Sequence, residues 1–253
     1  MASKVELMYG KGHVEVEIDE GIEVVVVEKP PMPLLDDPTA AVQAAIDEPQ
    51  AAEGGAPLPP LREFAKGKAT ACILICDITR PVPNGLNLPV LVRALLDGGV
   101  PASGITVLIA TGLHRPNEGA ELTELVGDAW VEETVTCVNH FARNDDDHVH
   151  VGTTSRGTVV RLDKRFVEAD IRIATGLVEP HFMAGYSGGR KVIAPGIAHA
   201  ETITTFHSAR FMEDPKAIEG NLEGNPLHED QLEIVASQSS NGLPSLFLHR
   251  AVV

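Results

Sequence analysis

A repeating order of apolar strand, loop and helix begins at residue 69 and constrains the fold of this chain more than any other feature. The run 69–76 is continuously apolar, and 105–110 repeats it after a stretch with leucines at helical spacing. Strands that are apolar on both faces are typical of parallel sheets covered by helices on both sides. The sequence therefore predicts an α/β fold with a mostly parallel, Rossmann-like sheet and helices on both faces.

The same pattern extends this predicted α/β core over residues 69–212. Helical spacing with end signals predicts helices at 88–96 (cap at Asn87, stop at Gly98-Gly99) and 118–126, a helical turn at 165–169 and a helix-like segment at 196–212. Apolar runs predict further strands at 134–138, 158–162 and 171–174. Ligands of such sheets bind beyond the carboxyl ends of the strands, so the residues that follow each strand are the ones to inspect.

The first 60 residues have a different character. Alternating apolar residues at 5–7 and 14–18, followed by the apolar run 22–27, predict a small β-meander over residues 1–29. Asp37 is a good cap for a helix at 38–48 that has proline at its first position. Residues 49–60, rich in proline and glycine, are expected to form a linker-like loop.

Charge and cysteine content limit the possible partners and the compartment. The formal net charge of −16 argues against binding to nucleic acid or to an anionic membrane, because both require positive surface. The three cysteines, Cys72, Cys76 and Cys137, lie in apolar runs without a Cys-x-x-Cys spacing and are expected to be buried free thiols. No run approaches 18 apolar residues, and no signal-peptide pattern is present, so a cytoplasmic protein is expected.

Polar residues follow three of the apolar strands. Asp77-Ile78-Thr79-Arg80 comes after the first, and two others are followed by Ala-Thr-Gly-Leu and then by His114 or His181. We expect two structurally equivalent exits that place both histidines over one crevice, with the N–H groups of the Thr-Gly turns as anion contacts. Two histidines on opposite sides of one carbon suit general acid–base chemistry, although Asp77 could be a simple turn cap and each histidine a structural one.

A glycine-rich stretch from Glu179 to Gly196 contains His181 and ends near Arg190-Lys191. Glycines let a backbone approach a ligand closely, so this stretch is expected to wrap an anion and to present an amine. It lacks the Gly-Lys-Ser/Thr ending of a phosphate-binding P-loop. His207 follows Lys191 by sixteen positions and is either a core histidine or a metal ligand that returns to the loop.

A second polar cluster covers residues 139–150 and contains three histidines and three consecutive aspartates. Consecutive aspartates cannot all face one ion, and no metal-ligand spacing is met. We therefore favour a solvated loop over a divalent metal site here.

Taken together, these motifs resemble the N-terminal domain of the lactate racemase family, the enzymes that use a nickel-pincer nucleotide. The shared signatures follow the family's order and spacing: Asp77-Ile78-Thr79-Arg80-Pro81, Thr111-Gly112-Leu113-His114-Arg115-Pro116, Glu179-Pro180-His181, Gly185-Tyr186-Ser187-Gly188-Gly189-Arg190-Lys191 and Pro195-Gly196-Ile197 with His207.

The resemblance implies a cofactor and the residues that hold it. The cofactor would be nickel pyridinium-3,5-bisthiocarboxylate mononucleotide, joined as a thioamide to Lys191, with His207 as a nickel ligand. The segment Asp77, Ile78, Thr79 and Arg80 matches the one that holds the nucleotide. A planar guanidinium is well suited to bind a substrate carboxylate, which is the second role implied for Arg80.

The resemblance also implies the reaction and its partners. His114 and His181 match the paired acid–base residues. The 2-hydroxyl of a small 2-hydroxy acid would lose its proton and its carbon a hydride, which would pass to the cofactor and return to either face of the 2-keto acid. Separate proteins would make the cofactor.

Family members are longer and carry a second domain over the crevice. We expect a lactate racemase-like domain over residues 1–236, an atypical tail over 237–253 and no C-terminal domain. One alternative is a nucleotide- or phosphate-binding module, or cofactor-binding half, without turnover. A metal hydrolase built on His181 and His207 ranks last, because no water-activating carboxylate stands at a recognised spacing.

Overall fold

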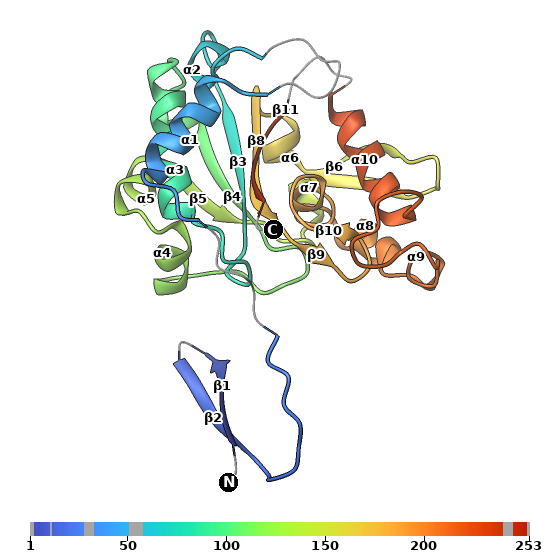
Figure 1. Ribbon diagram of the computed structural model, residues 1–253. Helices are drawn as coiled ribbons and strands as arrows, with labels where there is room; N and C mark the ends of the chain where they lie inside the picture. Colours follow the sequence, from blue (N-terminus) through green and yellow to red (C-terminus); the bar gives the residue numbers. More distant parts are fainter. Residues whose placement is uncertain (1–2, 11, 28–32, 51–57, 240–244, 252–253) are drawn as a thin grey trace. The chain divides into compact units, whose positions relative to one another are not determined.

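The computed structural model describes residues 3–10, 12–27, 33–50, 58–239 and 245–251 (Figure 1). The chain divides into two compact units, residues 1–36 and 37–253. Among the described residues, no helix is both long enough and apolar enough to cross a membrane.

The first unit contains a two-stranded hairpin instead of the predicted meander. β1 (Ser3–Tyr9) pairs antiparallel with β2 (Gly12–Ile18), with Val5 opposite Val16 and Leu7 opposite Val14. The apolar run at 22–27 is exposed and forms no strand. Its residues favour extended backbone, but a strand also requires a neighbour that pairs with its N–H and C=O groups.

The second unit is built on a five-stranded parallel sheet, which confirms the predicted α/β fold (Figure 1). The strand order is β11-β8-β3-β4-β5. The strands are β3 (Ala71–Cys76), β4 (Ile105–Ala110), β5 (Thr136–Asn139), β8 (Ile171–Val178) and β11 (Ser245–Ala251). β3 is buried along its first five residues, as expected for a strand that is covered on both faces.

Alternate residues of the central strands enter two separate hydrophobic cores. In β3, Ile73 and Ile75 pack on one face, whereas Cys72 and Leu74 pack on the other. Helices cover both faces (Figure 1). The first face is covered by α1 (Pro38–Asp47), α2 (Leu61–Phe64), α3 (Asn84–Asp97), α4 (Ala120–Val126) and α5 (Ala129–Thr134). The second is covered by α6 (Lys164–Val167), α7 (Arg190–Ile193), α8 (Ala200–Phe206), α9 (Ala209–Met212) and α10 (Pro226–Ser239).

Several local predictions are confirmed, and others are wrong for identifiable reasons. Asp37 caps α1 by accepting a hydrogen bond from the Ala40 N–H at 2.9 Å, as predicted. α3 begins at Asn84, earlier than predicted: Pro83 O accepts from the Leu86 and Asn87 N–H groups at 3.0 and 3.1 Å, and Pro89 is tolerated inside the helix. The helix α5 was not predicted. The predicted linker at 49–60 falls largely on residues 51–57, which lie outside the described part of the chain.

The predicted strand at 158–162 does not join the parallel sheet. It is β7 (Val159–Asp163), which pairs antiparallel with β6 (His148–Thr153) in a separate two-stranded sheet. Short 3₁₀ turns lie at Ala102–Gly104 and Asp145–Asp147, and β9 (Pro180–His181) pairs with β10 (Gly185–Tyr186). Of the three free cysteines only Cys72 is fully buried, so the expectation of burial was wrong for the other two.

The polar cluster at 139–150 is only partly the solvated loop that the sequence favoured. Asp145 and Asp146 are exposed, but His140 and His148 are buried and their rings meet edge to face at 5.0 Å. Asp163, which is also bound by Arg165, accepts from His140 at 3.3 Å, and Asn144 O accepts from His148 at 2.7 Å. Burial of His140 became possible because Asp163, which is distant in sequence, supplies its partner, whereas the partner of His148 lies only four residues away. No metal-binding group of three ligands occurs among the described residues.

Candidate active site

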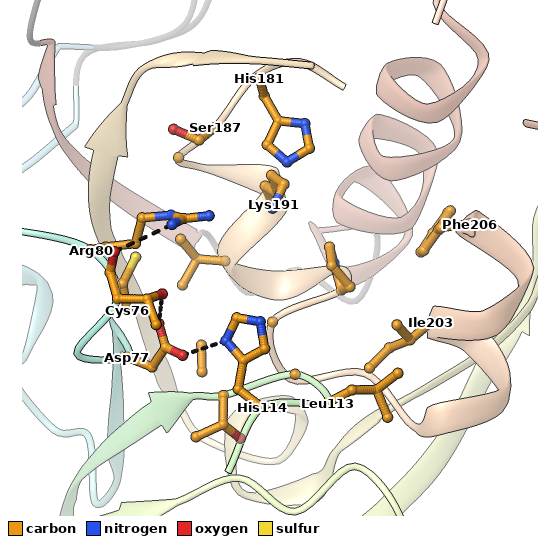
Figure 2. Close-up of a pocket in the computed structure, with 18 of the residues that line it drawn as sticks. Cys76, Asp77, Arg80, Leu113, His114, His181, Ser187, Lys191, Ile203 and Phe206 are labelled. Carbon is orange, nitrogen blue, oxygen red and sulfur yellow. Dashed lines mark hydrogen bonds and ion pairs between the residues drawn. The ribbon is translucent and has the colours of Figure 1, made fainter. Parts of the chain in front are cut away.

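A cavity of ≈ 330 Å³ lies beyond the carboxyl ends of β3 and β4 and beside the loop that leads into α7 (Figure 2). This is where a parallel α/β sheet is expected to bind its ligand. All the site residues predicted from the sequence line the cavity except Ile78: Asp77, Thr79, Arg80, His114, His181, Lys191 and His207. Ile78 packs instead against the hydrophobic core, and its N–H donates to Asn117 Oδ1 at 3.4 Å.

The two Ala-Thr-Gly-Leu segments are not equivalent, so that prediction was wrong. β4 ends at Ala110, and Gly112 then turns the chain with a φ of +55°, which favours glycine. β8 instead continues through Thr175 and Gly176 to Val178. Their N–H groups are not available as the predicted pair of anion contacts, because Gly112 N–H already donates to Gly196 O at 2.9 Å and Gly176 lies within a paired strand.

His114 presents one defined ring nitrogen to the cavity. Its Nδ1 lies 2.6 Å from Asp77 Oδ2. Because a carboxylate only accepts, Nδ1 carries the hydrogen in the neutral ring and Nε2 keeps its lone pair. Thr79 Oγ1 donates to the other carboxylate oxygen at 2.6 Å, which fixes the orientation of Asp77. The Asp77 side chain is buried, whereas the His114 ring is 59% exposed.

His181 is held in the opposite tautomer. Its Nδ1 accepts from the Met183 and Ala184 N–H groups at 3.4 and 3.2 Å, so the hydrogen of the neutral ring lies on Nε2. Burial, assisted by the positive charges of Lys191 and Arg80, lowers the pKa of this imidazole from 6.5 to about 4. His181 and His114 lie on opposite sides of the cavity, with Lys191 and Arg80 between them (Figure 2).

Lys191 enters the cavity from the first turn of α7. Gly188 and Gly189, with φ of +76° and +48°, turn the chain into this short helix, and the Lys191 N–H donates to Gly188 O at 2.9 Å. Burial, followed by the charge of Arg80, lowers the pKa of the Lys191 amine from 10.5 to about 8. A half-buried amine that is partly neutral near neutral pH can act as a nucleophile.

Arg80 is a half-buried cation at the same cavity. Its Nη1 donates to Thr79 O at 3.3 Å, and no carboxylate forms an ion pair with it among the described residues. Figure 2 shows its guanidinium directed toward the space beside Lys191. A planar guanidinium with free donors is suited to bind a carboxylate from a ligand.

His207 ends α8 and reaches the cavity with a free lone pair. Its Nδ1 donates to Ile203 O at 2.9 Å, which leaves Nε2 unprotonated in the neutral ring. This hydrogen bond to a carbonyl is the arrangement that orients histidines which bind metals. His207 is exposed, so the alternative of a core histidine does not hold.

The sequence did not identify the apolar walls of the cavity. Phe182, which stacks on His181 with ring centroids 4.8 Å apart, and Leu113 are both exposed at the cavity. Ile203, Phe206 and Leu227 form a buried wall. Phe182 and Leu113 adjoin predicted residues and could have been found by that proximity. Leu227 and Gln231 come from α10, where no motif marks them.

Two curated proteins with similar sequences are both lactate racemases. The lactate racemase of Thermoanaerobacterium thermosaccharolyticum is 39% identical over 181 residues, which are 72% of this chain and 42% of that protein. The lactate racemase of Lactiplantibacillus plantarum is 40% identical over 172 residues, which are 68% of this chain and 40% of that protein. This chain therefore spans about two fifths of the length of these curated relatives.

A solved structure and a family model point to the same family as these relatives. The lactate racemase apoprotein of T. thermosaccharolyticum superposes with a TM-score of 0.80 and 31% identity, over 99% of this chain and 56% of that one. The family model of the lactate racemase N-terminal domain matches residues 9–220, which include every candidate residue predicted from the sequence. The chain belongs to the lactate racemase N-terminal domain family.

Proposed function

We propose that this chain carries the cofactor-binding and acid–base half of a racemase or epimerase of small 2-hydroxy acids. The observation that carries the proposal is the pair of histidines on opposite sides of one cavity, held in opposite tautomers, with a cation and an amine between them (Figure 2). A racemase of 2-hydroxy acids that works through a 2-keto acid must take and return the hydroxyl proton for both enantiomers, and a histidine on each side of the substrate supports that chemistry.

The cavity suits a nickel-pincer nucleotide attached to Lys191. Burial keeps part of the Lys191 amine neutral, as an acylation that forms a thioamide requires. His207 Nε2 offers a neutral nitrogen ligand of the kind that nickel accepts. When bound, this cofactor would supply the hydride acceptor that side chains lack.

The side chains of this chain would perform the remaining steps. Arg80 would bind the substrate carboxylate and fix the position of the 2-carbon. His114 Nε2, which has a free lone pair, would take the proton of the 2-hydroxyl, while Asp77 stabilises the resulting imidazolium. His181 would stand on the other side with its Nε2–H donating to the substrate oxygen, and would act as the base for the opposite enantiomer in the tautomer that carries the ring hydrogen on Nδ1, which leaves the Nε2 lone pair free.

Asp77 takes a more specific role in this proposal than the sequence indicated. Its two carboxylate oxygens are occupied by Thr79 and His114, so it orients the base, and nucleotide contacts fall to Thr79 and Arg80. The proposal also includes separate cofactor-making proteins as partners, a cytoplasmic location and no nucleic-acid ligand.

Intact mass and nickel content of the chain, after co-expression with cofactor-making enzymes, test the proposal. We expect a mass increment on Lys191, nickel bound in proportion to it, and loss of both in Lys191→Met. His207→Ala should keep the increment and lose nickel. Chiral chromatography of D- and L-lactate then measures turnover, which His114→Gln and His181→Gln should each reduce. Unmodified Lys191 under these conditions would refute the attachment.

A further inference from the structure

Lys191 places in the cavity an amine that no other side chain binds. The residue lines the cavity, and among the described residues its Nζ makes no hydrogen bond or ion pair. Several side-chain atoms in the described part of the chain are both sealed from solvent and unpaired, but the Lys191 Nζ is not one of them. The unpaired amine is therefore open to whatever occupies the cavity.

Arg80 supplies a second cation beside this amine. Figure 2 shows its guanidinium directed toward the space next to Lys191. Among the described residues the guanidinium donates to Thr79 O alone, at 3.3 Å, so it keeps further donors for a ligand. A carboxylate bound by Arg80 would therefore hold the atoms attached to it close to a nucleophilic nitrogen.

The chemistry of these two groups defines one class of ligand. A lysine that is desolvated and lies beside another cation is of the kind that forms imines with carbonyl compounds. Burial and the charge of Arg80 both lower the pKa of the Lys191 amine, in that order of size. The molecule that suits both side chains has a carboxylate with a carbonyl carbon attached to it, which is a 2-keto acid. A simple ketone offers nothing to Arg80, and a 2-hydroxy acid offers the amine no ketone carbon.

We propose that the chain without cofactor has a further activity, in which Lys191 forms an imine with a 2-keto acid whose carboxylate is bound by Arg80. The Nζ lone pair attacks the 2-carbon, a C=N bond replaces the C=O bond, and the carbonyl oxygen leaves as water with the two hydrogens of the neutral amine. The step needs no oxidant or reductant. It does not depend on the proposed function, but it would block that function, because the same nitrogen would carry the cofactor.

Reductive trapping tests the inference on the 253-residue chain expressed without cofactor-making enzymes. Pyruvate with sodium cyanoborohydride converts an imine into a stable carboxyethyl-lysine, which mass spectrometry of the peptides locates. At pH 7 we expect Lys191 to be labelled at least about tenfold faster than the exposed Lys66, because more of its amine is neutral. Methyl pyruvate keeps the ketone and lacks the carboxylate charge, so the preference for Lys191 over Lys66 should fall about tenfold with this probe.

Three variants assign the parts of the two side chains. Arg80→Gln should slow the labelling of Lys191 by pyruvate by about tenfold or more, because it removes the carboxylate partner and raises the pKa of the amine. Arg93→Gln removes a cation outside the cavity lining and should leave the labelling unchanged. Lys191→Met should abolish the label at this position and leave that of Lys66 as it was.

The outcomes separate this inference from the proposed function. Equal labelling of Lys191 and Lys66 by pyruvate overturns the imine. An equal preference for Lys191 with pyruvate and with methyl pyruvate overturns the assignment of 2-keto acids as the ligand. Either failure leaves cofactor attachment to its own test, whereas unmodified Lys191 after co-expression refutes attachment and leaves the trapping result as it is.

Discussion

The amine of Lys191 can be tested directly, without loaded cofactor. Burial is the main reason that its pKa falls from 10.5 to about 8, and the charge of Arg80 is the second. At pH 7 an amine with a pKa of about 8 is neutral in about one molecule in ten, compared with about one in 3,000 at 10.5. The neutral fraction of Lys191 at pH 7 should therefore be about 300 times that of an amine of ordinary pKa, so at equal access Lys191 should react faster with an acylating reagent.

Competitive labelling with acetic anhydride, from neutral to alkaline pH, measures this difference. Mass spectrometry of the peptide that contains Lys191 should give a labelling midpoint at about pH 8. The exposed Lys66 serves as an internal reference for reagent decay. In Arg80→Gln the midpoint should rise but stay below 10.5, because burial remains.

A matched control and two contradicting outcomes complete the design. Arg93→Gln removes a positive charge from α3, where Arg93 stacks on Trp130 outside the cavity lining, and should leave the midpoint unchanged. A midpoint near 10.5 in the unchanged chain would refute the claim that burial activates Lys191. A midpoint that does not respond to Arg80→Gln would refute the part assigned to charge.

Three further predictions concern the histidines and the packing beneath them. Asp77→Ala removes the acceptor 2.6 Å from His114 Nδ1, and since the ring is partly exposed we expect about a tenfold slower racemisation by loaded protein; nitrogen-15 NMR that still shows the Nδ1–H tautomer would contradict this. The folded-state pKa of His181 is about 4 and its ordinary value 6.5, so the unfolded chain binds the extra proton and stability should fall as pH falls through this window. When the free energy of unfolding is measured by urea titration across this pH window, His181→Gln should make it depend less on pH. An equal pH dependence in both proteins would argue against this role of His181. Gly196→Ala would place a Cβ 2.0 Å from Val192 O and should cost at least about 2 kcal/mol, so an unchanged urea midpoint would disprove the close approach.

The sheet could be predicted because its signal is local. An apolar run such as 105–110 is buried on both faces wherever it forms a strand, and the structure has β4 at those residues. The helix α5 and the pairing of β6 with β7 were missed, because short polar segments carry no clear period and their partners are chosen by tertiary contacts.

The site was predicted in part for the same reason. His114, Lys191 and Arg80 were found from their positions after strands and glycines, and the structure brings them to one cavity. The equivalence of the two Ala-Thr-Gly-Leu segments was inferred from four identical letters. It failed because β8 is paired on both sides. Its pairing with β3 stops at Ala174, but its pairing with β11 continues to Val178 and keeps it extended beyond Gly176, whereas β4 ends at Ala110.

The sequence by itself determined which chemical groups are present and that a parallel sheet would gather them at the ends of its strands. Only the tertiary structure decided how each group behaves. Asp77 and His114 are 37 positions apart in the sequence, and their side chains come within 2.6 Å only when the chain folds. Tautomer and pKa depend on such neighbours, because hydrogen bonds and desolvation act over a few ångströms of space rather than along the chain.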